Sequence, residues 1–300
     1  MMMMESRSHL VVARVGAKSL HREWLTGTGP RLWDLQLSQY DDHPGFEHDG
    51  DLPLSKDKGT KWDSISRLFE ANPGLLDRYR YIMLMDDDVR LNLDDMNRFL
   101  NIVDAHDLAV AQPALHPDSY FCYPILLRCA GLRLRYSNFV EGMAPALRSD
   151  HLRYVLDWMK TYHSGWGIDR LWAVYMKDPS FRAAIVDEVQ MLHTRPHGTG
   201  AVYESFHQKS VDPRSDMAKL LSSYENTPDR MLVYGAVTRG GRALNGATAR
   251  LWNGTNLIAN AWRYRSKRYV LRTGAGMLVR SVTEAGYRPK PILTTSDIAV

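Results

Sequence analysis

The chain has 300 residues, of which 44% are apolar and 24% charged, a composition that excludes wholesale disorder and suffices for a buried core. No segment approaches the roughly 18 apolar residues of a membrane-spanning helix, and residues 1–8 lack the apolar part of a signal peptide, so we expect a cytoplasmic protein without a transmembrane segment. The net charge of +4 is uneven, because residues 212–300 contain 14 Lys and Arg against 6 Asp and Glu.

The first elements alternate between strands and a helix. Residues 9–15 predict a buried strand, and residues 33–37 predict a short strand within a polar, loop-rich stretch. Apolar residues at helical spacing predict a helix over residues 62–69. Residues 81–85 form an uninterrupted apolar run, as expected for an interior parallel strand. This order predicts an α/β fold.

Further helices and strands follow to about residue 186. Asn92 is the expected cap of a helix with apolar residues from Leu93 to Val103, and residues 108–111 predict the next strand. Three further elements are predicted: a helix capped by Ser149, a helix from about Gly167, and a strand over residues 183–186. Beyond Gly198 the periodicity weakens, so we divide the chain into a catalytic domain (residues 1–211) and a basic C-terminal extension (residues 212–300).

Three aspartates, Asp86, Asp87 and Asp88, directly follow the predicted strand 81–85. Ligands of open α/β sheets bind at the carboxyl ends of strands. Adjacent carboxylates repel one another, and a hard divalent cation such as Mg²⁺ or Mn²⁺ offsets that repulsion. The alternative is a solvated turn that caps the following helix. The strand context favours the metal site.

Two later segments add candidate residues to the three aspartates. In Ser-Gly-Trp-Gly-Ile-Asp, the glycines let the backbone approach a ligand, and Asp169 falls in the first turn of a helix. Asp169 is a candidate general base; alternatively, it only stabilises the helix N-terminus. His193 follows the strand-like segment 185–192 and could complete a metal shell.

In this order, the motifs resemble those of the GT-A glycosyltransferase fold, a Rossmann-like mixed sheet flanked by helices. Over about residues 61–200 the chain also resembles a glycosyltransferase-like family from plants and bacteria, long described as a domain of unknown function. The matching stretches are Thr60-Lys61-Trp62, Tyr81 to Val89, Ala111 to Leu115, Val140 to Pro145, Gly165 to Asp169, and Val186-Asp187.

The resemblance implies roles for individual residues. Asp86 and Asp88 match the carboxylates that hold a divalent metal and the nucleotide sugar, and Asp87, which lies between them in that motif, is a further candidate for binding the nucleotide sugar. Asp169 matches the acid that removes the acceptor proton in many inverting members, and His193 matches a late histidine that often ligates the metal. This chain has Gly-Ile-Asp where many relatives have Glu-Asp or Asp-Asp, a departure that bears on the base assignment.

Five more residues are weaker candidates. Lys61 and Glu141 lie in matched motifs, where they would contact a phosphate and an acceptor hydroxyl; an exposed salt bridge and a buried carboxylate bonded to loop amides are their alternatives. Trp166, flanked by glycines, is the candidate sugar-contacting ring. Arg14 and Gly16 lie at the end of the first strand, where this fold usually receives the nucleotide.

The C-terminal extension mixes rings and positive charges, a pattern that suits phosphate contact with stacking or a strand with a solvated arginine face. Its residues of this kind are Arg250, Trp252, Trp262, Arg263, Tyr264, Arg265, Lys267, Arg268, Tyr269 and Arg272. A glycan, a lipid-linked glycan or nucleic acid could therefore be the acceptor, and transfer to a DNA base would require base flipping.

These features predict a metal-dependent glycosyltransferase that moves a sugar from a nucleoside diphosphate sugar to an acceptor hydroxyl, with inversion. Two alternatives stay open. One is a metal-dependent phosphohydrolase or nuclease that uses the same aspartates, and the other is a non-catalytic module that binds nucleotide sugars.

Overall fold

The structure is a computed structural model that describes residues 7–175, 182–196 and 212–294. The strands are β1 (His9–Val15), β2 (Trp33–Gln39), β3 (Ser55–Lys56), β4 (Tyr81–Met85), β5 (Val89–Arg90), β6 (Val110–Leu115), β7 (Leu132–Ser137), β8 (Ala146–Arg148), β9 (Ala183–His193), β10 (Tyr224–Glu225), β11 (Val233–Thr238), β12 (Ala243–Asn245) and β13 (Leu293–Thr294). The helices are α1 (Lys61–Ala71), α2 (Leu75–Arg78), α3 (Leu93–Ala105), α4 (Ser149–Thr161), α5 (Ile168–Leu171), α7 (Pro213–Ser222), α8 (Gly246–Ala259) and α9 (Lys267–Thr283), with short 3₁₀ turns η1 (His21–Leu25), η2 (Pro124–Leu126) and η3 (Ala261–Arg263).

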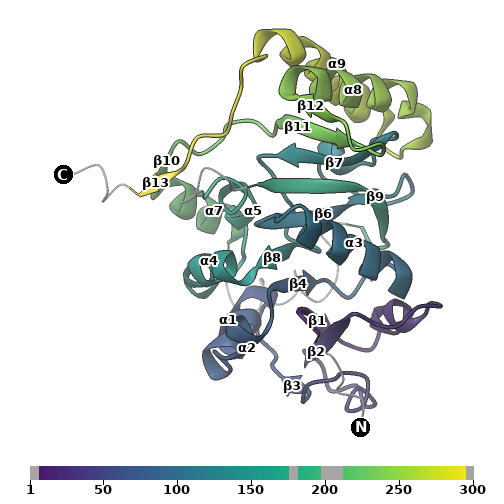
Figure 1. Ribbon diagram of the computed structural model, residues 1–300. Helices are drawn as coiled ribbons and strands as arrows, with labels where there is room; N and C mark the ends of the chain where they lie inside the picture. Colours follow the sequence, from purple (N-terminus) through teal and green to yellow (C-terminus); the bar gives the residue numbers. More distant parts are fainter. Residues whose placement is uncertain (1–6, 176–181, 197–211, 295–300) are drawn as a thin grey trace.

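A large mixed sheet organises the described residues (Figure 1). Its strand order is β12-β11-β7-β9-β6-β8-β4-β1-β2-β3, and β5 pairs with β9. β1 pairs in parallel with β2 and β4, and β6 pairs in parallel with β9, while β8 lies antiparallel between β4 and β6. Strands β1, β2, β4, β6 and β9 therefore all point the same way, and their carboxyl ends meet at one edge of the sheet.

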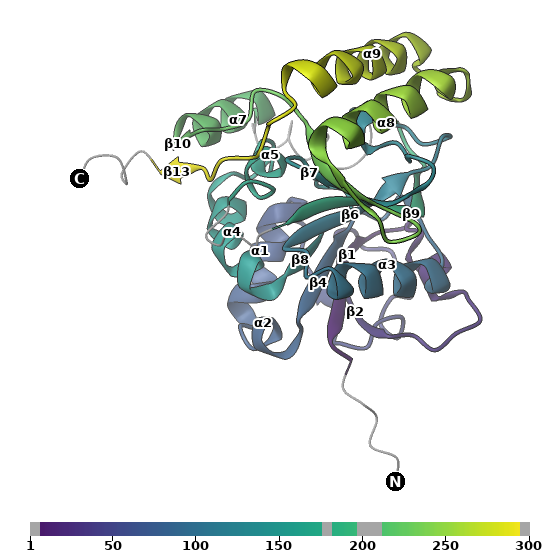
Figure 2. The same cartoon turned by 45° about the horizontal axis from the view of Figure 1, so that its top comes forward.

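Helices cover both faces of this sheet and create two hydrophobic cores (Figure 2). Because side chains alternate along a strand, Ile82 and Leu84 of β4 pack on one face with α1 and α4, while Met83 and Met85 pack on the other face with α3. Every residue of β4 is buried. The apolar run that predicted an interior strand is explained by this burial on both sides.

Most predicted elements are present at or near their expected positions. β1 and β4 have the predicted bounds, and Asn92 caps α3 by accepting a hydrogen bond from the Asp95 N–H. Ser149 is not a cap, because it is the first residue of α4 and its hydroxyl donates to the Tyr79 carbonyl. The predicted strand 183–186 and the strand-like segment 185–192 together form one strand, β9, which ends at His193.

Most of the basic and aromatic residues named for the C-terminal extension lie on α8, η3 and α9, so the strand considered for them is wrong. α8 and α9 pack against each other beside β11 (Figure 1), and β11 pairs with β7 of the large sheet. Arg250 of α8 is fully buried and donates hydrogen bonds to the carbonyls of Val233, Arg280 and Glu284. The boundary predicted after residue 211 falls outside the described residues.

Among the helices that the structure describes, none combines the length and the apolar character needed to cross a membrane.

Candidate functional site

The three aspartates follow β4 at the sheet edge where the parallel strands end. Beyond them, β5 pairs antiparallel with the end of β9, and Val89 lies opposite His193 in that pairing. This pairing brings residues far apart in sequence together, since the His193 Nε2 atom lies 3.3 Å from the Asp88 Oδ2 atom. The other ring nitrogen of His193 lies 2.9 Å from the Tyr120 carbonyl oxygen, which orients the imidazole.

Asp88 and His193 shift each other's titration. Burial alone would raise the pKa of Asp88, but the hydrogen bond and positive charge of His193 outweigh burial and lower it. Burial alone would lower the pKa of His193, but the contact with Asp88 raises it to about 9. The two side chains therefore form an ion pair at neutral pH.

Asp86 is held by Lys61, which lies at the start of α1. The Lys61 Nζ atom is 2.6 Å from Asp86 Oδ1 and 2.7 Å from the Gly142 carbonyl oxygen, and its side chain is only 9% exposed. Burial raises the pKa of Asp86, and the Lys61 charge opposes that rise. The Lys61 ammonium group is thus buried and bonded to the protein, and it does not form an exposed salt bridge. Its contacts connect the end of β4 to the loop that follows Glu141.

The Asp87 carboxyl group is bonded to Tyr40 and Arg195. The Tyr40 hydroxyl donates to its Oδ2 atom at 2.6 Å, and an Arg195 nitrogen lies 3.1 Å from its Oδ1 atom. Burial raises the pKa of Asp87 to about 6, although both partners lower it. Gly16 packs against the Tyr40 ring, since a Cβ atom there would lie 2.4 Å from a ring carbon. Gly16 therefore supports the Tyr40–Asp87 contact.

Arg14 is buried beneath this region. Its guanidinium donates to the hydroxyls of Ser38 and Ser64 and to the carbonyls of Asp57 and Gly59. These bonds fix the loop before α1 and engage the guanidinium that was predicted to contact the nucleotide.

Glu141 is a buried carboxyl group without a hydrogen-bond partner for one oxygen. Its side-chain Oε2 atom has no partner among the described residues, and its backbone N–H donates to Gln112. Burial raises the pKa of Glu141 to about 8, and the charges of Asp169 and Asp86 act in the same direction. The interpretation of Glu141 as a carboxylate bonded to loop amides does not hold for this oxygen.

Asp169 is placed by two glycines in left-handed conformations. Gly165 has φ +69° and Gly167 has φ +94°, and Asp169 is the second residue of α5. Removal from water raises the pKa of Asp169 to about 6, although nearby Arg170 and backbone N–H groups lower it. The Asp169 charge therefore acts on Glu141, and the pKa of Glu141 is higher than that of Asp169.

Replacing Gly165 by alanine should destabilise the protein and disturb this loop. An added Cβ atom would lie 1.9 Å from the Trp62 ring nitrogen, and the left-handed backbone alone costs an alanine about 1–2 kcal/mol. We expect a lower melting temperature by calorimetry. G74A is the matched control, because Gly74 has φ −63° and open space around it, and its melting temperature should not fall. An unchanged melting temperature for G165A would contradict the tight packing on Trp62.

The tryptophans of this region divide between core and surface. Trp172 is fully buried, and its ring N–H donates to the Val140 carbonyl at 2.7 Å. Trp62 packs edge-on against Trp172 at a ring separation of 5.8 Å. Trp166 is 38% exposed, so its ring is accessible to a ligand.

A divalent cation fits Asp88 and His193 only with help from other ligands. Two ligands each about 2.1 Å from one ion lie about 3 Å apart, close to the separation of these two side chains. No group of three His, Cys, Asp or Glu side chains suited to a metal occurs among the described residues. The donor set thus fits an ion that takes its remaining ligands from a diphosphate and water, as Mg²⁺ commonly does.

Sequence reasoning missed three residues of this region. Tyr40 and Arg195 contact Asp87, and Gln112 anchors the backbone of Glu141. Arg195 lies two positions after His193, and Gln112 lies in the stretch Ala111 to Leu115 that resembles the family. The sequence therefore offered a reason to consider both residues. Tyr40 had none, because its role depends on the parallel pairing of β1 and β2.

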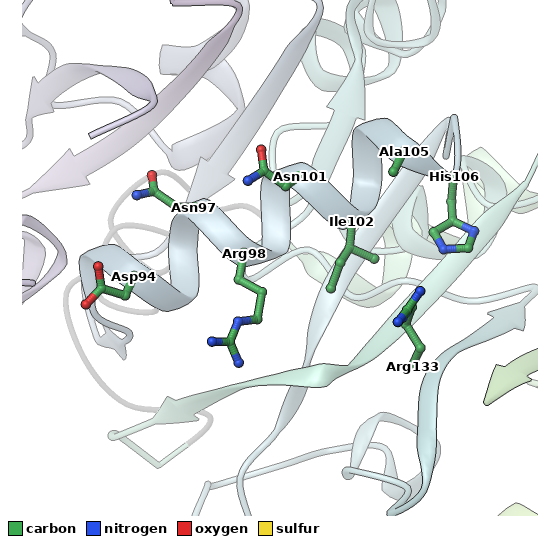
Figure 3. A pocket seen from close by; sticks show the side chains of 8 residues that line it. All are labelled: Asp94, Asn97, Arg98, Asn101, Ile102, Ala105, His106 and Arg133. Carbon is green, nitrogen blue, oxygen red and sulfur yellow. The ribbon is translucent and has the colours of Figure 1, made fainter. Parts of the chain in front are cut away.

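A separate hollow of about 410 Å³ runs along α3 (Figure 3). Its lining includes Asp94, Arg98 and His106 of α3 and its following turn, with Arg133 of β7 opposite. None of the candidate site residues lines it.

Comparisons with known proteins agree with the resemblance in the sequence. A family described as "Protein of unknown function (DUF707)" matches residues 33–137, a range that includes β4 and the three aspartates. A search of curated proteins gives no match.

Solved structures of two proteins are similar to this chain. TarS 1–349 from S. aureus, also solved with UDP-GlcNAc, has a TM-score of 0.46 at 10% identity, with 93% of this chain and 82% of TarS 1–349 covered. GalNAc-T7, solved with UDP, GalNAc and Mn²⁺, has a TM-score of 0.50 at 9% identity, with 73% of this chain and 48% of the GalNAc-T7 chain covered. The chain therefore has the GT-A fold, and its residues 33–137 match the DUF707 family.

Proposed function

We propose that this protein is a glycosyltransferase that moves a sugar from a nucleoside diphosphate sugar to an acceptor hydroxyl, with inversion at the anomeric carbon. The observation that carries the proposal is the position of Asp86, Asp88 and His193 at the carboxyl ends of β4 and β9 in a GT-A fold. The charges of Asp169, His193 and Asp86 all act on the buried Glu141 carboxyl group, which supports one shared site. GalNAc-T7, which shares the fold, was solved with UDP and Mn²⁺, and this supports a uridine nucleotide as the first donor to test.

Asp88 and His193 would hold Mn²⁺ or Mg²⁺. Such an ion, when bound, neutralises charge on the diphosphate leaving group. The proton that His193 carries at neutral pH must leave before its nitrogen binds a metal. Lys61 keeps the Asp86 carboxylate in position beside this pair, where it can accept hydrogen bonds from sugar hydroxyls.

The transfer step needs one base, and Asp169 suits it. The acceptor oxygen bonds to the anomeric carbon while the bond from that carbon to the diphosphate oxygen breaks, and its electron pair leaves with the nucleoside diphosphate. The acceptor proton passes to the Asp169 carboxylate, which is ionised at neutral pH because its pKa is about 6. Glu141, with a pKa of about 8, stays protonated and can donate its unused hydrogen bond to a substrate oxygen.

Binding of UDP should depend on both Asp88 and the metal. In a thermal-shift titration, UDP with Mn²⁺ should raise the melting temperature, EDTA should abolish the rise, and D88N should weaken the apparent affinity about tenfold or more. D118N is the control, because the Asp118 side chain is 73% exposed, and it should behave as wild type.

The same screen includes the diphosphates of adenosine, guanosine and cytidine. A metal-dependent shift with none of the four nucleotides would overturn the proposal. Cleavage of bis(p-nitrophenyl) phosphate in the absence of any sugar donor, lost in D88N, would support the phosphohydrolase interpretation instead.

A further inference from the structure

A second cavity lies between α9 and the segments that contain residues 123–125 and 138–139. Its volume is about 340 Å³, within the size range of small-molecule sites. Four segments line it: residues 123–125, residues 138–139, residues 228–231 and the inner face of α9, joined by Arg170 of α5. The cavity is thus built from the catalytic part of the chain and from the basic C-terminal part together.

Positive charge dominates the lining. It contains four arginines, Arg170, Arg230, Arg272 and Arg280, and one acid, Asp229. Arg230 and Arg280 lie 3.2 and 3.9 Å from a carboxylate oxygen of Glu284, so their charge is partly balanced. For the side chains of Arg170 and Arg272, the described residues provide no hydrogen bond or ion pair. Two guanidinium groups are therefore available to an anion.

Aromatic and apolar side chains complete the cavity. Tyr123 packs edge-on against Phe139 at a ring separation of 4.7 Å, and Tyr269 of α9 is 45% exposed. Met231 and Met277 add apolar surface. Tyrosine rings beside guanidinium groups suit a ligand that has both a ring-shaped, partly apolar body and a negative charge.

The cavity adjoins the proposed catalytic acids. Arg170 directly follows Asp169 in α5, and Tyr123 contributes to the lining. Burial raises the pKa of Tyr123, and the charges of Asp169 and Glu141 raise it further, so the tyrosine lies within electrostatic reach of both carboxyl groups. A ligand held between Tyr123 and Arg170 would therefore lie beside the segment of α5 that carries Asp169.

We propose that this cavity binds the acceptor and that the acceptor is an acidic saccharide, whose carboxylate or phosphate contacts Arg170 and Arg272. The inference rests on the proposed function, because it assigns the acceptor of the same reaction. A compact cavity with arginines converging on it fits one or two sugar rings, whereas a nucleic acid duplex requires a long track of positive charge along its phosphates.

Calorimetric titration with glucuronate, glucose 6-phosphate and uncharged glucose tests the inference. One or both acids should bind wild type, and glucose should not; the two acids tell a carboxylate site from a phosphate site. R170A and R272A should each weaken binding of the acid about tenfold or more. R263A is the control, because Arg263 is exposed, lies in the same basic region and does not line the cavity.

Three results would overturn the inference: no binding of either acid, equal binding of glucose, or a loss with R263A as large as with R272A. The last would indicate a broad basic surface of the kind that binds nucleic acid. UDP with Mn²⁺ is titrated into the same wild-type sample, so a failure of the donor site is seen separately from a failure of the acceptor cavity.

Discussion

Replacing Asp169 by asparagine should lower kcat for sugar transfer by about 10²–10⁴-fold, with little change in the affinity for the donor nucleotide. Asparagine keeps the shape of the side chain but cannot take the acceptor proton. The measurement is the release of nucleoside diphosphate from the donor nucleotide sugar identified by the binding screen. Because release to water also requires a base, the assay works before the acceptor is known.

The pH dependence gives a second readout of the same variant. A base acts when it is deprotonated, so kcat/KM of wild type should rise as the pH increases through the Asp169 pKa of about 6. It should fall again as Glu141 loses its proton near its pKa of about 8. D169N should lack the rising limb, because the group that titrates there is gone.

The control for this variant is D157N. Asp157 is an exposed carboxylate of α4 outside the site, and its replacement should leave both the rate and the pH profile as in wild type. If D169N kept the wild-type kcat while E141Q lost it, the base would be Glu141 and the assignment of Asp169 would be wrong.

The elements that the sequence predicted well are those with strong local signals. β4 was predictable because all five of its residues are buried, and α3 because its Asn92 cap and its apolar face agree. β9 joins the predicted strand 183–186 and the strand-like segment 185–192 into one strand, although Asp187, Glu188 and Gln190 interrupt its apolar pattern. Asp187 has a buried partner on β7, and tertiary contacts of this kind leave no trace in local periodicity.

The sequence indicated which residues belong to a candidate site, but it did not indicate which side chains they contact. The position of Asp86 to Asp88 after a buried strand indicated a ligand site. The contact between Asp88 and His193 depends on the pairing of β5 with β9, which joins residues about a hundred positions apart. Lys61 was expected to contact a phosphate, but its ammonium group donates to the Asp86 carboxylate and to the carbonyls of Leu84, Gly142 and Met143.

Asp187 belongs to a stretch that resembles the family, yet its surroundings indicate a structural role. It forms a fully buried, two-pronged ion pair with Arg135, with N–O distances of 2.8 and 2.9 Å, and it accepts the Cys129 N–H at 2.7 Å. Arg135 also donates to the carbonyls of Ile125 and Leu127. The pair therefore fixes the segment around η2, which lines the cavity proposed to bind the acceptor.

D187A should destabilise the protein by about 3–5 kcal/mol, because the buried guanidinium of Arg135 would lose its counter-ion. At about 2–4 °C per kcal/mol, the melting temperature should fall by roughly 6–20 °C in calorimetry. E188A is the matched control: Glu188 is the next residue, and its partly exposed pair with Arg133 should contribute only about 0–1 kcal/mol. A D187A protein that kept the wild-type melting temperature but lost activity would instead place Asp187 in contact with a substrate, and the interpretation of this pair as a purely structural anchor would be wrong.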